Sequence, residues 1–519
     1  MASGGYPNRR QRLEDAGRRL ELARDCKLNQ DIDYALVKTG KRSSAAIFTL
    51  PDEVLLLILE TAYTHDFPHC RNVQLCETCS PITFSHVCRR FKRVSLMSSK
   101  VWTCIHIALG QPANFGKIIA THLANSRNLP LNVTFQYVLA PPYHTTDAEP
   151  WAKYKLHCNR AMTWWNIALL HHHRWKGLAV FFATMDTAIP YVNQLATCEL
   201  PLLESLYAWV DKRCTAEPVH EGGILLPTAP RLTTLSLCTE LFEVVSPPAL
   251  QNVSKLALAR GWKEDVIDLT DMLSYCAPSL TYLEVTGDCN FEIGDEVVQT
   301  VYLPHLRHLL IHFARDEIWH TLLSVLDAPD LESLVVEDEE SLNGFVAAIQ
   351  DGAQHFPKLR YLSISHMEEQ SSQALHGTTP LFLRSFPALT HLKIRTQSCQ
   401  YGVMRQILCG DLSETDEDVP PSTALCPNLR TLILEGPKAD EDALIRFAQR
   451  QTRNTKSFKT IRLQNPGPMP LSPSTVKSLT NMGITIVFQK EGTSYRFDAY
   501  NWNSAEFIPW DESVFCYND

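Results

Sequence analysis

The sequence lacks long apolar runs: no stretch approaches the roughly 18 consecutive apolar residues that indicate a membrane-spanning helix. The first residues, MASGGYPNRRQRLEDAG, lack the apolar core of a secretion signal, and Glu14 and Asp15 argue against an organelle transit peptide. The 16 cysteines follow no framework spacing, so without an export signal we expect reduced thiols. These absences predict a cytoplasmic or nuclear protein with no membrane partner.

A strong excess of positive charge is also absent. The chain has 48 Lys and Arg against 57 Asp and Glu, a formal net charge of −9, so no global positive field attracts nucleic acid. The hydrophobic fraction of 45% and the charged fraction of 20% are typical of a protein that buries a sizeable core. We therefore expect no nucleic-acid partner.

Familiar catalytic motifs are missing as well. The chain contains no Gly-x-Ser-x-Gly elbow, no phosphate-binding Gly-x4-Gly-Lys-Ser/Thr loop, no His-Glu-x-x-His helix and no Gly-x-Gly-x-x-Gly turn. This absence favours a binding protein over an enzyme. We expect no catalytic residues and no cofactor.

What the sequence does contain is a repeated pattern, Pro-x-Leu-x-x-Leu-x-aliphatic, as in APSLTYLEV, LPHLRHLLI and FPKLRYLSI. The prolines of this series are Pro201, Pro230, Pro278, Pro304, Pro329, Pro357, Pro387 and Pro427. Weaker copies without the proline start at 173, 251 and 456, so that eleven copies have a mean spacing of about 28 residues. This period and pattern are the signature of leucine-rich repeats.

The repeat pattern predicts the architecture. Leu283 and Val285 lie two residues apart and point to the same side of a strand, which cannot bury that side alone. Stacking of neighbouring repeats makes one continuous core, with helices such as residues 316–328 and 441–451 returning outside. A proline before each strand ends the preceding helix without removing a ladder hydrogen bond. The predicted fold is α/β: a leucine-rich-repeat solenoid, or horseshoe, with parallel strands on its concave side.

Upstream of the repeats, Thr49 and Asp52 have capping-box spacing and Pro51 lies in the first turn of a helix predicted over about residues 50–60. Residues 54–59 are all apolar, whereas a surface helix normally buries only one stripe. Two explanations remain open. The helix is buried within its own domain, or its second face is covered by another protein.

A second helical stripe follows, and Trp102 comes shortly after it; the stripe consists of Phe84, Val87, Cys88, Phe91 and Val94. Together, LPDEVLLLILE, FSHVCRRFKRVS and VW resemble the F-box, a compact three-helix module that docks onto a Skp-family adaptor. The segment between the two halves, residues 61–83, is longer than is usual in an F-box.

The resemblance implies a function and a docking surface. The chain would be the substrate-recruiting subunit of a Skp–cullin–F-box ubiquitin ligase, bound to a Skp-family adaptor and through it to a cullin. The repeats would hold an unidentified protein target. Alternatives are a repeat scaffold unrelated to ubiquitin and an enzyme whose site lies in the 61–83 insertion. The expected adaptor-binding residues are Leu50, Pro51, Val54, Leu55, Ile58, Val87, Cys88 and Phe91.

The side chains that alternate with the inward leucines should face the concave side of the repeats. They mix aromatic, basic and acidic groups, which suits a protein partner; Tyr282, Tyr361 and Arg395 are of the types enriched at binding hot spots. Plain solvent exposure of these positions is the alternative. The expected target-binding residues are Tyr282, Glu284, His308, His312, Tyr361, His391, Lys393 and Arg395.

These patterns divide the chain into five parts. They are an N-terminal helix and basic linker over 1–45, an F-box-like module over 46–105, a connecting region with degenerate first repeats as one interpretation over 106–170, the solenoid over 171–490, and an aromatic cap or tail over 491–519. The tail either covers the open end of the solenoid or completes the target site. The acidic segment 411–422 is expected to be a solvated loop inserted on one rim, with repulsion or recruitment of a partner as the alternative.

One segment, HDFPHCRNVQLCETC, raises the question of a metal. A Cys-x-x-Cys pair could contribute to a tetrahedral zinc site, but no second pair has zinc-finger spacing. We expect ordinary thiols and no metal, with a structural zinc as the alternative. Its candidate ligands are His65, His69, Cys70, Cys76 and Cys79.

Overall fold

The structure is a computed structural model. It describes residues 50–64, 81–109, 111, 114–137, 148–210, 228–238, 248–259, 269–286, 300–312, 323, 326–338, 345, 349, 356–366, 380–396, 408, 426–436, 440–464 and 471–489.

The chain forms two compact units. The smaller unit comprises Met1–His65 and Pro81–Val101, and the larger comprises Asp66–Ser80 and Trp102–Asp519. The boundary expected near residue 105 therefore lies at 101/102. Trp102, which the F-box resemblance included, belongs to the larger unit, where its ring meets His122 edge-on at 5.2 Å.

The described part of the smaller unit contains three α-helices: α2 (Asp52–Thr64), α4 (Pro81–Val87) and α5 (Arg89–Met97). The helix predicted over about residues 50–60 is confirmed as α2, whereas Thr49, its expected cap, lies outside the described residues. The second stripe is not one helix but two. Cys88 adopts an extended conformation (φ −162°, ψ 170°) and caps α5, its Sγ accepting from the Phe91 N–H at 3.5 Å.

The small core of this unit lies between α2, α4 and α5. Leu55 and Leu59 of α2 are fully buried, and Phe91 and Val94 are buried on α5. Phe84 of α4 stacks on Phe91 with ring centroids 6.0 Å apart. Leu55 and Leu59 are four residues apart, so they lie on the same side of α2, and this is the inner side of the helix.

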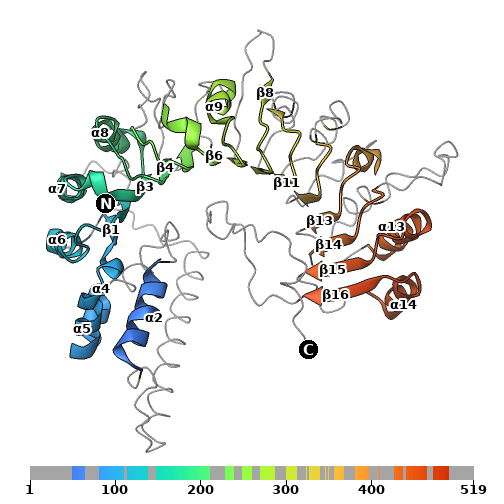
Figure 1. Ribbon diagram of the computed structural model, residues 1–519, viewed down its shortest axis with the longest axis horizontal. Coiled ribbons are helices and arrows are strands. Elements are labelled where there is room, and N and C mark those ends of the chain that lie inside the picture. The colour runs from blue at the N-terminus through green and yellow to red at the C-terminus, as the bar shows by residue number, and fades with distance from the viewer. Residues whose placement is uncertain are drawn as a thin grey trace, which may run out of the picture. The chain divides into compact units, whose positions relative to one another are not determined.

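The larger unit is built on a parallel sheet of 14 strands whose order in the sheet follows their order in the chain (Figure 1). The strands are β1 (Cys104–Ala108), β2 (Leu131–Tyr137), β3 (Trp175–Phe182), β4 (Ser205–Val210), β5 (Thr234–Cys238), β6 (Lys255–Ala259), β7 (Tyr282–Thr286), β9 (His308–His312), β11 (Ser333–Asp338), β12 (Tyr361–His366), β13 (His391–Thr396), β14 (Thr431–Glu435), β15 (Thr460–Gln464) and β16 (Thr485–Gln489). Two short strands, β8 (Val301–Tyr302) and β10 (Leu326–Asp327), pair separately.

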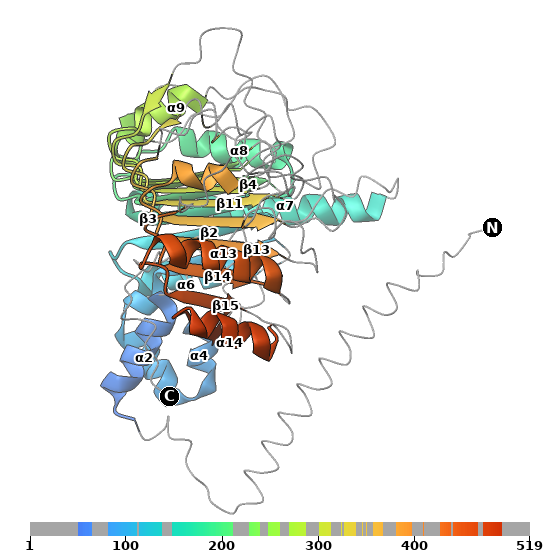
Figure 2. The ribbon, with the colours of Figure 1, turned by 90° about the vertical axis from the view of Figure 1, so that its right-hand side faces the viewer.

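The described helices of this unit lie on one side of the sheet (Figure 1). The α-helices are α6 (Phe115–Asn125), α7 (Ala148–Leu169), α8 (Met185–Ala196), α9 (Leu269–Cys276), α13 (Glu441–Asn454) and α14 (Pro473–Asn481), and the short 3-10 helices are η3 (His172–Arg174), η6 (Pro248–Asn252) and η7 (Pro380–Ser385). A further 3-10 turn, η2 (Lys100–Trp102), spans the chain boundary between the units. Figure 2 shows neighbouring strands running in the same direction and α7 extending past the edge of the sheet. None of the helices in the described ranges is long and apolar enough to cross a membrane.

The repeat register predicted from the sequence is confirmed. Each of the eight prolines lies four residues before a strand, as Pro357 does before β12. Leu362 of β12 pairs in register with Leu392 of β13, and both are fully buried in the core between sheet and helices. The α/β class is thus shown, with an unbroken parallel sheet as its basis.

Several boundaries differ from the prediction. The sheet begins at Cys104 rather than at 171, because β1 pairs with β2 and β2 pairs with β3; β2 lies in the expected connecting region, for which degenerate first repeats were one interpretation. Its other end agrees with the predicted limit at 490, since the last strand, β16, ends at Gln489, although it lies beyond the last predicted copy of the pattern. The return helix over 441–451 is confirmed by α13, but the one predicted over 316–328 does not reach its expected end, since Leu326 and Asp327 form β10; of residues 316–325 the structure describes only Leu323.

The HHHR stretch, residues 171–174, forms a structural joint. Arg174 is buried; its Nε and Nη2 donate to the carbonyl of Leu129 at 3.1 and 2.8 Å, and Nη2 also donates to Ser126 Oγ at 2.8 Å. The arginine therefore ties the start of β3 to the turn that follows α6.

Candidate docking surfaces

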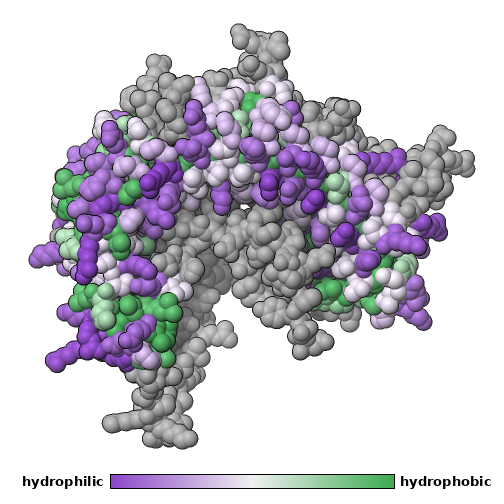
Figure 3. All heavy atoms as spheres, in the orientation of Figure 1, coloured by the Kyte–Doolittle hydropathy of each residue, from purple (hydrophilic) through white to green (hydrophobic). Residues whose placement is uncertain are grey.

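The outer side of α2 is apolar and exposed. Leu57 is 62% exposed, Ile58 43% and Val54 40%, although Leu55 and Leu59 of the same helix are fully buried. Figure 3 shows hydrophobic residues gathered at the surface over α2. We call Val54, Leu57 and Ile58 the outer face of α2. An exposed apolar cluster of this kind marks interaction sites more often than ordinary surface.

The expected adaptor-binding residues divide into two groups. Pro51, Val54, Ile58 and Val87 are exposed, and Leu50 and Cys88 are half-buried, so these are placed where a partner can reach them. Leu55 and Phe91 are buried, 0% and 3% exposed, and the prediction that they contact a partner is corrected: they hold α2 on α5. Leu57, which is more exposed than Val54, Ile58 or Val87, was not among the predicted residues. A run of six apolar residues does not by itself reveal which of them face outward.

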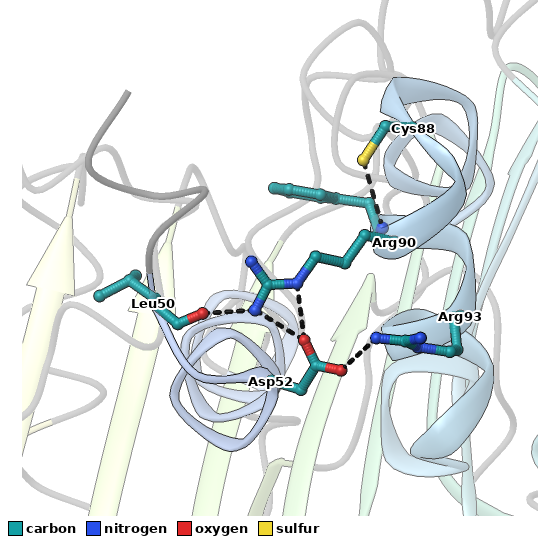
Figure 4. A network of polar contacts seen from close by, with 6 residues as sticks. Leu50, Asp52, Cys88, Arg90 and Arg93 are labelled. Carbon is teal, nitrogen blue, oxygen red and sulfur yellow. Dashed lines mark hydrogen bonds and ion pairs between the residues drawn. The ribbon is translucent and has the colours of Figure 1, made fainter. Parts of the chain in front are cut away.

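The first turn of α2 is bound to α5 by Asp52 (Figure 4). Arg90 donates from Nε to Asp52 Oδ1 at 2.6 Å, and Arg93 donates from Nη2 to Oδ2 at 2.6 Å. Arg90 Nη2 also donates to the backbone carbonyl of Leu50. Hydrogen bonds from Arg90 and then from Arg93 lower the pKa of the Asp52 carboxyl, so the carboxylate is held in its charged form.

The other end of α2 is bound through Glu60. Ser98, the C-cap residue of α5, donates from Oγ to Glu60 Oε1 at 2.6 Å, and Lys100 Nζ lies 3.4 Å from Oε2. Ser98 is buried. The two contacts, Asp52 with Arg90 and Arg93, and Glu60 with Ser98 and Lys100, are called the end clamps below.

In the larger unit, the face of the sheet opposite the helices carries the residues that alternate with the core leucines; we call it the open face. Some expected target-binding residues there are buried and bonded to one another. Glu284 is 4% exposed and accepts from the Tyr282 hydroxyl at 2.9 Å, and His312 is 1% exposed. Burial, and then Glu284, raises the pKa of Tyr282. The prediction that Tyr282, Glu284 and His312 contact a target directly is therefore corrected.

A row of polar and charged side chains crosses the open face from β9 to β14. His312 Nδ1 lies 2.8 Å from Glu337 Oε2, and Arg395 lies between Glu337 and Glu435 at 3.9 and 3.6 Å. Burial raises the pKa of Glu337, but the His312 hydrogen bond and the nearby cations outweigh it, so the pKa is lowered overall. Glu337, which pairs in register with His312, was not among the predicted residues.

The remaining predicted target-binding residues are accessible. Lys393 and Arg395 each keep 23% of the side chain exposed, although Lys393 Nζ contacts Glu435 at 2.6 Å. His308, Tyr361 and His391 are half-buried and share one row of the sheet, since Tyr361 pairs with His391 across β12 and β13. These five residues are the part of the predicted set that a partner can reach.

The zinc candidates and the aromatic tail lie outside the described residues. Among the ranges that the structure describes, no group of three or more His, Cys, Asp or Glu side chains is arranged to hold a metal ion. The acidic segment 411–422 also lies outside these ranges.

Comparison with known proteins does not assign the chain to a family. No protein-family model matches it, and no curated protein matches it.

Proposed function

We propose that the chain is a substrate-recognition subunit of a Skp–cullin–F-box ubiquitin ligase. In this proposal the smaller unit is an F-box-like module that docks a Skp-family adaptor, and the repeats form a leucine-rich-repeat horseshoe that binds a protein target. The observation that carries it is the exposed apolar outer face of α2, on a helix that opens with the F-box-like sequence LPDEVLLLILE.

The physical basis is apolar burial. Val54, Leu57 and Ile58 lie on the side of α2 away from Leu55 and Leu59, so a partner with an apolar groove would bury the second side of the helix. Complete burial of a fully exposed side chain of this size is worth about 1.5–3 kcal/mol, so these side chains, which are 40–62% exposed, would each contribute roughly half of that. Cullin and ubiquitin-transfer components would act through the adaptor. The chain itself would supply proximity, not catalysis.

The test is co-purification of the full chain with a Skp-family adaptor, followed by measurement of the dissociation constant. In the variant Leu57→Asp/Ile58→Asp, carboxylates would face the apolar groove, and we expect binding to be lost. The matched control is Leu170→Asp, since Leu170 is a 76% exposed apolar residue in the larger unit. The assignment of the outer face would be contradicted if the Leu57→Asp/Ile58→Asp chain bound the adaptor with wild-type affinity while a substitution elsewhere in the chain, such as Leu170→Asp, abolished binding.

The second candidate is a repeat scaffold that binds proteins without promoting ubiquitination. The network across β9–β14 favours protein binding in either case, because it places Lys393 and Arg395 on an accessible sheet face. Reconstituted ubiquitin transfer to proteins captured on the repeats separates the two. Capture without transfer, in the presence of adaptor and cullin, would favour the scaffold.

A further inference from the structure

The sequence of α2 does not say which side of the helix should be buried. Residues 54–59 are apolar all round, and Val54, Leu57 and Ile58 have chemistry similar to that of Leu55 and Leu59. Rolling the helix about its axis would exchange one apolar pair for another with little change in buried apolar area. Hydrophobic burial therefore holds α2 on α5 without specifying its rotation.

The polar residues at the two ends of α2 do specify it. Asp52 and Glu60 are separated by eight residues, which places them about 80° apart around the helix, on the same half as Leu55 and Leu59. Asp52 accepts from two arginines of α5, and Glu60 accepts from the residue that caps α5. A rolled helix would lose both sets of charge-assisted hydrogen bonds, each stronger than a neutral one.

The two end clamps also bracket the apolar run without entering it. Asp52 lies two residues before Val54, and Glu60 follows Leu59 directly. Arg90 reaches beyond Asp52 to the carbonyl of Leu50, so it fixes the backbone that enters the helix as well (Figure 4). Polar contacts that select one packing among several of similar apolar energy are a known use of buried or half-buried charges.

From this geometry we infer that Asp52 and Glu60 are positioning residues that turn the outer face of α2 toward its partner. The inference rests on the proposed function for the identity of that partner. Without the end clamps, α2 would remain helical and remain on α5, but only a fraction of molecules would present Leu57 and Ile58 outward. The apparent affinity for the partner falls by that same fraction.

The rotation itself can be measured without any partner. Leu57→Cys and Leu55→Cys are introduced separately into the full chain, and the rate of iodoacetamide labelling at each position is followed by peptide-resolved mass spectrometry. The outward position should label much faster than the buried one. Adding Asp52→Ala/Glu60→Ala should reduce the ratio of the two rates by about tenfold as rolled states become populated. An unchanged ratio would overturn the inference.

The second measurement is affinity for a Skp-family adaptor. The Asp52→Ala/Glu60→Ala variant should bind about tenfold more weakly, while circular dichroism still shows the wild-type helix content. Asp52→Glu/Glu60→Asp, which keeps both carboxylates, should recover part of the loss. Glu149→Ala is the control, since it removes an exposed acid from the first turn of α7.

The outcomes separate the two claims. A changed labelling ratio with no adaptor binding by the wild-type chain would sustain the positioning role and refute the proposed function. Wild-type and clamp-deficient chains that bind the adaptor equally well would refute the positioning role and leave the proposed function standing.

Discussion

In both units something must determine which face of a helix or strand is buried, and the determinant differs between them. In β12, Leu362 and Ile364 alternate with Ser363 and Ser365, so a slip of one residue would place polar groups in the core. In α2 no such alternation exists, and the end clamps determine which side of the helix is buried. The comparison teaches that a periodic pattern specifies orientation by itself, whereas a uniform apolar run needs polar contacts outside it.

The largest effect is expected where the alternation is broken. Leu362→Asp places a charge at a position that is 0% exposed, and it should lower the free energy of unfolding of the larger unit by on the order of 5 kcal/mol. Urea denaturation followed by circular dichroism measures this. Arg360→Asp, at an exposed position just before β12, is the control and should change stability by less than about 1 kcal/mol. Equal curves for wild type and Leu362→Asp would refute the repeat register.

The larger unit also contains the polar joint at Arg174, and removing it sharpens the comparison. Arg174→Met keeps the apolar stem but takes away both donors to the Leu129 carbonyl, so we expect a loss of about 2–3 kcal/mol. Thermal unfolding of the variant beside wild type checks the value. A stabilised variant would mean that burying the guanidinium outweighs its hydrogen bonds.

Acidification should destabilise the larger unit through His122. Burial lowers the pKa of His122 to about 4, from an ordinary value near 6.5, so the folded state keeps the ring neutral while the unfolded state takes up a proton. Above about pH 6.5 the ring is neutral in both states and does not affect the free energy of unfolding. As the pH falls toward 4, protonation of the unfolded state lowers the free energy of unfolding, by on the order of 2 kcal/mol at pH 5.

This dependence is measured as unfolding free energy against pH between 7 and 4. His122→Phe, which retains an aromatic ring beside Trp102, should reduce the slope in that window. His305→Gln, at an exposed position, should leave it as in the wild type. A slope that is identical in all three chains would contradict the assignment to His122.

The smallest effect on stability is expected on the outer face of α2. Ile58→Asp, the same kind of substitution as Leu362→Asp, should change the free energy of unfolding by less than about 1 kcal/mol, because Ile58 is 43% exposed. Hydrogen exchange of the α2 amides compares the variant with the wild-type chain. Unfolding of α2 in the variant would mean that Ile58 belongs to the core of the smaller unit.

The sequence was informative where a residue type has one structural meaning. A proline four residues before the strand located eight strands, because proline ends the preceding helix and the leucines mark the core side. β1 lacks both signals: CIHIA contains neither a leucine nor a nearby proline at that spacing. β2 follows Pro130 directly, out of the pattern, and β16 has no proline at the fixed offset.

The candidate sites were less predictable, because exposure depends on partners far away in the chain. The break at Cys88 was invisible in a continuous apolar stripe, since it depends on backbone torsions and on the thiol capping α5. Alternation placed Glu284 and His312 on the open face correctly, but it does not reveal that Tyr282 and Glu337 bond and cover them. Leu57 was missed for the same reason, since only the end clamps decide that it faces outward.

The order of the strands has a consequence for how this protein is made. Each strand of the main sheet from β1 to β16 pairs only with the strands just before and after it in that sheet. Only the connection between one strand and the next must close before such contacts form, so folding can advance by nearest-neighbour growth. During synthesis, each strand can add to the finished part of the sheet soon after it leaves the ribosome, well before the last repeat has been translated.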